Sequence, residues 1–305
     1  MGVADLIPGV SGGTVALISG IYPRLLAAIT GCNMTALQLL LRGQWRDLWQ
    51  QIDGAFLLPL ILGIGTAIIT LAGVLSVLLE TQALLVWSFF FGLVWASSLY
   101  LVRDELGRPT LRTSAFLVAG IAVMLVVGLG PGLEFPRHQG GFFAAGMLGI
   151  CAMILPGISG SFILVMLGMY SAVIAAVVER DLGLLLFFGL GCATGLLAFS
   201  RLLVWILERA RGETLALLVG FLLGSLVILW PWQQVVETVA DGKGGERPLR
   251  SLPVSPQQYD SMLGDSQLIA CLLSAIAGGV LIVVLHRLAQ RSGKPGHGRA
   301  GLDRG

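Results

Sequence analysis

The sequence predicts an all-α polytopic membrane protein with an inverted repeat, each half being one re-entrant helical hairpin plus three transmembrane helices. Three observations lead to this fold class. Hydrophobic residues make up 56% of the 305 residues and charged residues only 12%, about half the share of a soluble domain. Long apolar stretches recur along the chain, and two of them, 148 residues apart, resemble each other. The chain therefore needs a lipid bilayer as its solvent.

The composition also excludes several classes of protein. A soluble protein of 32.2 kDa could not keep its surface hydrated with so few charges. Disorder, nucleic-acid binding and a disulfide-stabilised scaffold are excluded as well. The four cysteines are scattered and form no Cys-x-x-Cys pair, so we expect no metal site and no cofactor. The net charge of +2 says little about partners.

Six apolar stretches have the length of about 20 residues that a helix needs to cross a bilayer. These predicted spans are 55–79, 84–102, 114–133, 182–206, 214–231 and 266–289.

Two further stretches do not fit a simple span. As one helix, 142–178 would be about 55 Å long, too long for a hydrocarbon core of about 30 Å. Pro156-Gly157 interrupts it near its middle, where both residues disfavour a helix. We therefore expect a re-entrant hairpin at 142–178. A similar hairpin is expected at 1–29, which contains Pro8-Gly9, although only seven residues precede Pro8.

The segments between the spans are predicted more coarsely. Segment 34–50 carries two tryptophans and two arginines and is predicted as an interfacial amphipathic helix. Segment 233–265, with three prolines, is predicted as an extended loop outside the membrane. The tail 290–305, rich in glycine and arginine, is predicted as a disordered cytoplasmic segment.

The positive-inside rule orients these spans. If the two hairpins are re-entrant, the polar segments on one side carry twelve Lys and Arg residues and those on the other side five. We therefore expect both termini in the cytoplasm of a bacterial cell and the protein in its cytoplasmic (inner) membrane. The first apolar stretch has no basic leader and no cleavage site, so no signal peptide is expected.

The internal repeat is the most informative feature. Segments 4–29 and 152–177 are identical at nine of 26 positions without a gap. Chance matches in apolar sequence favour Leu, Ala and Val, whereas these fall largely on Pro, Gly, Ser and Tyr. The matches include Pro8/Pro156, Gly9/Gly157, Ser11/Ser159, Gly12/Gly160, Gly20/Gly168 and Tyr22/Tyr170. The repeats then cover 1–133 and 142–289, and three crossings in the first invert the second, as in many transporters.

The two Pro-Gly-x-Ser-Gly loops are the candidate binding site. Pro8-Gly9 and Pro156-Gly157 are predicted hinges that end the incoming arms. A new helix then begins, and the free N–H groups and dipole of its first turn attract phosphate. The predicted phosphate-binding residues in these loops are Ser11, Gly12, Gly13, Thr14, Ser159, Gly160 and Ser161. The alternative is that these turns serve only close packing and a bend.

Ionisable residues at membrane depth are costly and often functional. Arg24 and Arg201 are predicted to bind phosphate through forked hydrogen bonds, or else to reach the cytoplasmic interface. Asp5 is a candidate for pairing with an arginine or for coupling to ion movement, or else a solvated residue. Tyr22 and Tyr170 are predicted to line the cavity or to anchor the chain at an interface.

The doubled motif also carries a family resemblance. ADLIPGVSGGT with GIYPRLL, followed by LPGISGSFILVMLGMY, resembles the bacterial polyprenyl-phosphate transporter family of the PopT type, over roughly 1–290. The resemblance implies a flippase that returns undecaprenyl phosphate to the inner leaflet. That movement would recycle the lipid carrier for peptidoglycan and other cell-envelope polymers. Its partners would be the polyprenyl phosphate and the bilayer, with a proton or a cation as candidate coupling ion.

Two other functions remain open. A small-anion transporter or channel could also use two opposed half-helices, although the Asn-Pro-Ala signature of aquaporins is absent. An intramembrane serine hydrolase would use one of the two Gly-x-Ser-Gly sequences, but a serine nucleophile needs a base. The histidines, His138, His286 and His297, are poorly placed for that role. We therefore expect a lipid transporter rather than an enzyme.

Overall fold

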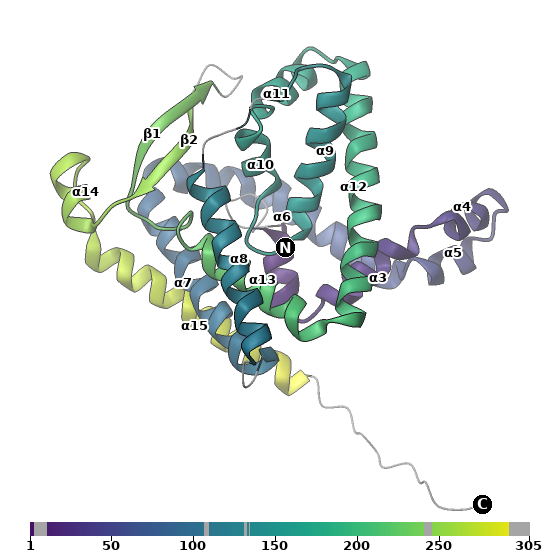
Figure 1. The fold of residues 1–305 in the computed structure, drawn as a ribbon, viewed down its shortest axis with the longest axis horizontal. Helices are drawn as coiled ribbons and strands as arrows, with labels where there is room; N and C mark the ends of the chain where they lie inside the picture. Colours follow the sequence, from purple (N-terminus) through teal and green to yellow (C-terminus); the bar gives the residue numbers. More distant parts are fainter. Residues whose placement is uncertain (3–10, 107–109, 131–132, 134, 241–245, 293–305) are drawn as a thin grey trace, which may run out of the picture.

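The structure, a computed structural model, describes residues 1–2, 11–106, 110–130, 133, 135–240 and 246–292. Within these residues it is a bundle of helices with one small β-hairpin at its side (Figure 1). The first helices are α2 (Gly12–Ile18), α3 (Tyr22–Gly31), α4 (Met34–Leu41), α5 (Trp45–Gln51), α6 (Gly54–Thr81), α7 (Ala83–Leu101), the π-helical η1 (Val102–Leu106) and α8 (Leu111–Leu129). They are followed by α9 (Gln139–Ile154), α10 (Gly160–Met166), α11 (Tyr170–Val178), α12 (Leu182–Arg209), α13 (Arg211–Ser225), α14 (Pro256–Met262) and α15 (Leu268–Ser292).

The predicted spans correspond to α6, α7, α8, α12, α13 and α15. Four of them, α6, α7, α8 and α12, are long and apolar enough to cross a membrane. The helical, polytopic class of the prediction is thus confirmed. Helix α13 has 15 residues and ends at Ser225, before the predicted end at 231, because a turn follows and Pro231 cannot continue a helix. Ten of its residues are buried, so α13 is a core helix.

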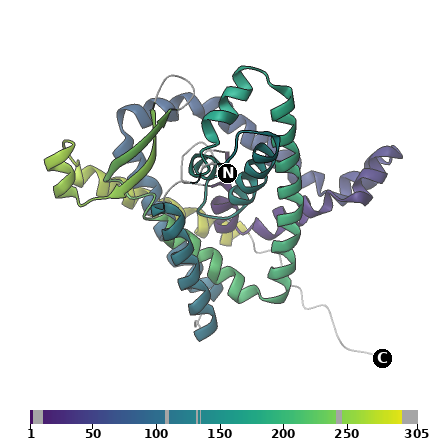
Figure 2. The same cartoon turned by 45° about the horizontal axis from the view of Figure 1, so that its top comes forward.

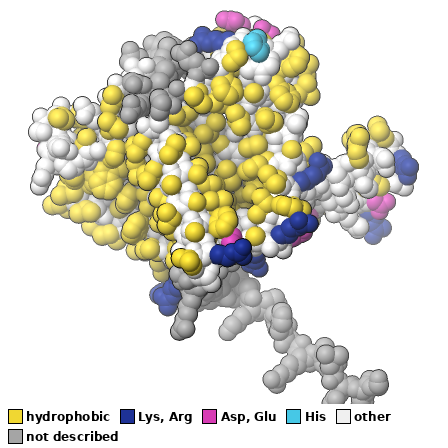
Figure 3. All heavy atoms as spheres, viewed as in Figure 1, with side chains coloured by type: hydrophobic (Ala, Val, Ile, Leu, Met, Phe, Trp, Pro, Cys, Tyr) yellow, Lys and Arg dark blue, Asp and Glu magenta, His cyan; other side chains and the backbone are white. Residues whose placement is uncertain are grey.

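Three parallel helix pairs make up most of the body: α9 with α12, α8 with α13, and α7 with α15. Glycines allow the close approach, as small residues do between membrane helices. Gly120 and Gly220 face each other, and a Cβ on either would lie 3.0 Å from the Cα of the other. On the face in Figure 3, hydrophobic side chains cover the middle and charged ones gather at the top and toward the lower edge.

The predicted hairpin at 142–178 has a clear turn. The backbone N–H of Phe135, just before α9, donates to the carbonyl oxygen of Leu167, just after α10, at 3.0 Å. Helices α9 and α10 therefore run antiparallel, and the chain returns to the end from which it came. Helix α11 then leaves α10 at 106°. In the first half α2 and α3 meet at 120°, but the arm before α2 falls in 3–10, outside the described residues.

The structure corrects the prediction for 233–265. Instead of an extended loop, β1 (Gln233–Ala240) and β2 (Glu246–Pro253) form a two-stranded antiparallel sheet, followed by α14. The indole N–H groups of Trp230 and Trp232 hold its base, donating at 2.9 Å to the carbonyl oxygens of Val254 and Ser266. This sheet is the one departure from an all-α chain among the described residues.

The predicted interfacial helix at 34–50 is two short helices, α4 and α5. Gly43, with φ +68°, makes the turn between them, and Trp45 and Trp49 are exposed. Figures 1 and 2 both show this pair projecting from the body. Most of the predicted tail at 290–305 lies outside the described residues.

Candidate functional site

The two repeated loops meet in the core, although 148 residues separate them. The Ser11 hydroxyl donates to the carbonyl oxygen of Met153 at 2.7 Å. In the other direction, the backbone N–H of Gly157 donates to the Thr14 hydroxyl at 2.8 Å. The first loop thus supplies two side-chain hydroxyls, and the second loop supplies one backbone carbonyl oxygen and one backbone N–H. We call residues 11–14 together with 153–161 the loop junction.

The loop junction is dry and closely packed. Ser11 is 1% exposed and Thr14 is 0% exposed. Gly13 packs so closely on the carbonyl oxygen of Ile154 that a side chain at this position would overlap it. The Tyr22 hydroxyl, 1% exposed, donates to the same oxygen at 3.2 Å. The Ser11, Thr14 and Tyr22 hydroxyls therefore all bind the second loop.

Local sequence explains these conformations. Ser11 is extended and caps α2 by accepting from the N–H of Gly13 at 3.0 Å, the usual role of serine before a helix. Leu155 is extended, as the residue before a proline tends to be. Gly157 has φ +85°, which favours glycine. A Cβ there would also lie 2.9 Å from the carbonyl oxygen of Phe221 on α13.

The second motif uses its hydroxyls differently from the first. The hydroxyls of Ser159 and Ser161 lie 2.9 Å apart and bind each other. Ser159 occupies the cap position of α10, yet its side chain makes no capping hydrogen bond. Helix starts carry N–H groups that need partners. The start of α10 is thus the part of the junction whose polar groups are least committed to the opposite loop.

The other predicted site residues lie elsewhere. The Arg24 guanidinium holds both carboxylate oxygens of Asp53, at 2.6 and 3.0 Å, and lies over the ring of Phe56. Its hydrogen bond lowers the pKa of Asp53. Arg201 is exposed on α12, and Tyr170 is half-buried at the start of α11. Asp5, Pro8 and Gly9 lie outside the described residues. The structure therefore brings together the motif hydroxyls and Tyr22, but not Arg24.

We expect Arg24→Gln and Asp53→Asn to have equally small effects on transport and on the thermal unfolding temperature. The reason is that Arg24 is 58% exposed and exposed ion pairs contribute little to stability. Lipid movement in liposomes and thermal unfolding in detergent measure the two effects. The double variant serves as control and should match either single variant. Slower transport for Arg24→Gln alone would assign Arg24 to the phosphate instead.

A cavity of about 400 Å³ lies beside the junction, between α3, the end of α12 and the start of α13. Tyr22 lines it, together with Glu208 and Arg211. Among the described residues, no group of three or more His, Cys, Asp and Glu side chains could hold a metal ion.

Comparisons with known proteins agree with the family resemblance of the sequence. Residues 1–247 match the family model "VCA0040-like", described as undecaprenyl phosphate translocase-like. A polyprenyl-phosphate transporter of Vibrio cholerae is 38% identical over 292 residues, covering 95% of this chain and 94% of that protein. The chain belongs to this family. A polyprenyl-phosphate transporter of Staphylococcus aureus is 33% identical over 250 residues, 76% of this chain and 83% of that protein. No solved structure gives a significant match.

For this member of the undecaprenyl phosphate translocase-like family, sequence reasoning missed part of the site. It did not connect Glu208 or Arg211 with a cavity. The sequence carries one signal, since Glu80 recurs 128 residues later as Glu208.

Proposed function

We propose that this chain moves polyprenyl phosphate between the leaflets of the bacterial cytoplasmic membrane, returning the lipid carrier used for peptidoglycan and related polymers. The observation that carries the proposal is the loop junction, where two copies of one motif meet through reciprocal hydrogen bonds inside a polytopic protein. The names of its relatives in Vibrio cholerae and Staphylococcus aureus support the substrate.

The chemistry of the lipid fits this arrangement. A phosphate monoester is strongly anionic near neutral pH, so its crossing requires polar groups at membrane depth. Ser159, Gly160 and Ser161 offer hydroxyls and a helix start for the head group, while Ser11 and Thr14 hold the first loop against the second. The isoprenoid tail stays in lipid. Arg201 remains a predicted phosphate contact and Asp5 a predicted coupling residue, whereas the Arg24 guanidinium is committed to Asp53.

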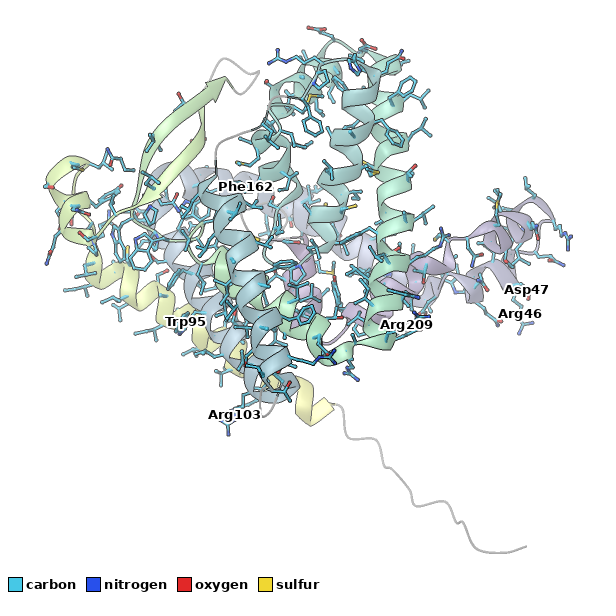
Figure 4. All side chains as sticks on the ribbon, in the orientation of Figure 1. Arg46, Asp47, Trp95, Arg103, Phe162 and Arg209 are labelled. Carbon is cyan, nitrogen blue, oxygen red and sulfur yellow. The ribbon has the colours of Figure 1, made fainter. Side chains whose placement is uncertain are left out.

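In this proposal the two halves form an inverted repeat with both termini in the cytoplasm. Residues at one end of the bundle support the orientation. Leu101 at the end of α7 and Arg211 at the start of α13 line the same cavity, and Arg103 and Arg209 both lie toward the lower edge of Figure 4. Arg180 lies at the other end of α12, about 42 Å away by helical rise. The more basic end faces the cytoplasm under the positive-inside rule.

The test is lipid movement in liposomes that contain purified protein and polyprenyl phosphate in both leaflets. A phosphatase added outside removes phosphate only from lipid in the outer leaflet. With the wild-type chain we expect all of the lipid to become accessible with time. In protein-free liposomes, the control, dephosphorylation should stop once the polyprenyl phosphate of the outer leaflet is consumed.

Two further measurements separate the alternatives. The paired variant Ser159→Ala with Ser161→Ala should slow lipid movement because the head group loses two hydroxyl partners. Flux of chloride and inorganic phosphate is recorded in the same liposomes. Small-anion flux without lipid movement would replace the proposal with a small-anion transporter.

A further inference from the structure

The cavity beside the junction has the size and composition of a ligand site. Its volume of about 400 Å³ falls in the usual range for pockets that hold small molecules. It is formed by four parts of the chain: the α2–α3 turn and α3, the end of α7, the end of α12 and the start of α13. Residues far apart in the sequence thus converge on it.

The inner wall of the cavity is hydrocarbon. Leu17, Leu26, Leu101 and Leu215 line it and are each less than 9% exposed. Water is poorly stabilised in a cavity lined by such side chains, because it finds few hydrogen-bond partners there. An alkyl or isoprenoid group would instead bury its own apolar surface against these leucines.

The cavity also has charged side chains. Glu208 and Arg211 line it and are both exposed, so the cavity wall carries one carboxylate and one guanidinium. A guanidinium binds phosphate oxygens through paired hydrogen bonds. A matching ligand therefore has an apolar part for the leucine wall and an anionic group next to Arg211.

Tyr22 connects this cavity to the loop junction. Its ring lines the cavity, and its hydroxyl donates to the carbonyl oxygen of Ile154 in the second loop. A head group that leaves the junction toward the basic end would therefore pass next to this side chain.

We infer that this cavity binds the lipid at the basic end of the protein, with the first isoprenoid units against its leucine wall and the phosphate at Arg211. The inference rests on the proposed function for the identity of the lipid. The inferred site holds the lipid at the basic end of the protein, before or after its head group crosses the junction.

The first experiment measures ligand protection at the cavity. Ala27 is exposed and lines the cavity, so Ala27→Cys in a Cys32→Ser background provides a thiol there for maleimide labelling, quantified by mass spectrometry. Farnesyl phosphate, at about ten times its dissociation constant, should slow labelling about tenfold. Inorganic phosphate alone should leave the rate unchanged. Ala193→Cys, at an exposed position of α12 outside the cavity wall, is the matched control and should not be protected.

Two outcomes overturn the inference. Equal protection by inorganic phosphate would show that the cavity does not select a prenyl chain. Absence of protection by farnesyl phosphate would show that the lipid does not bind there.

The second experiment fills the cavity and uses the liposome assay. Ala27→Phe places a ring in the cavity and should slow lipid movement about tenfold, whereas Ala193→Phe should transport like the wild type. If the wild type moves lipid and Ala27→Phe moves it as fast, the cavity inference fails and the proposed function stands. If the wild type moves none but farnesyl phosphate still protects position 27, the proposed function fails and the binding site stands.

Discussion

Gly13→Val is expected to slow lipid movement by about tenfold or more and to lower the free energy of unfolding by about 1–3 kcal/mol. A Cβ at position 13 would overlap the carbonyl oxygen of Ile154 and lie 3.2 Å from that of Met153. Both obstacles are backbone atoms, so no side-chain rotation relieves them. The first turn of α2 must move away, and the hydrogen bonds of Ser11 and Thr14 to the other loop are lost. The liposome assay and thermal unfolding in detergent measure the two effects.

The matched control for this variant is Gly63→Val. Gly63 lies in α6, and a Cβ there meets no atom within 4 Å, so the same substitution should change neither property. If Gly13→Val behaved like Gly63→Val, the two loops would not pack together as described. Loss of stability without loss of transport would contradict the role of the junction in lipid movement.

The loop junction shows how far the sequence leads and where it stops. The repeated Pro, Gly and Ser residues predict two broken helices, because these residue types end and cap helices wherever they occur. The partners of Ser11 and Tyr22 could not be predicted, since they are backbone carbonyl oxygens of Met153 and Ile154. A backbone group has no sequence signature, and only the fold decides which one faces a hydroxyl.

The β-hairpin was missed for a different reason. Prolines at 248 and 253 argue against a strand within a sheet, because proline cannot donate a ladder hydrogen bond. In this two-stranded sheet each strand has a partner on one edge only. A residue whose N–H would face the other, unpaired edge donates no ladder hydrogen bond, so proline is tolerated there. Pro253 pairs with Gln233 at the very end of the ladder, where one missing donor costs little. The cavity was missed because its wall comes from four segments whose proximity is a property of the packing.

Thr14→Val is expected to destabilise the protein by about 1–3 kcal/mol, the cost of a buried polar group without a partner. The substitution keeps the shape of the side chain but removes the oxygen that accepts the N–H of Gly157 at 2.8 Å. Both sides of this contact are buried, so water cannot replace the lost acceptor. Thermal unfolding of the purified protein measures the loss, and Thr14→Ser, which keeps the oxygen, should restore most of the stability.

The same variants distinguish the two interpretations of the motif hydroxyls. If the Thr14 hydroxyl fastens the loops, transport by Thr14→Val should fall together with stability, and Thr14→Ser should recover both. Adding Ser11→Ala should then cost less than the sum of the single effects, because both hydrogen bonds join the same two loops and fail together. If the hydroxyl instead contacts the phosphate, Thr14→Val should slow transport at unchanged stability. We expect the first result, since the geometry already commits this oxygen to Gly157 and leaves the head group to the second motif, where the hydroxyls of Ser159 and Ser161 bind only each other among the residues that the structure describes.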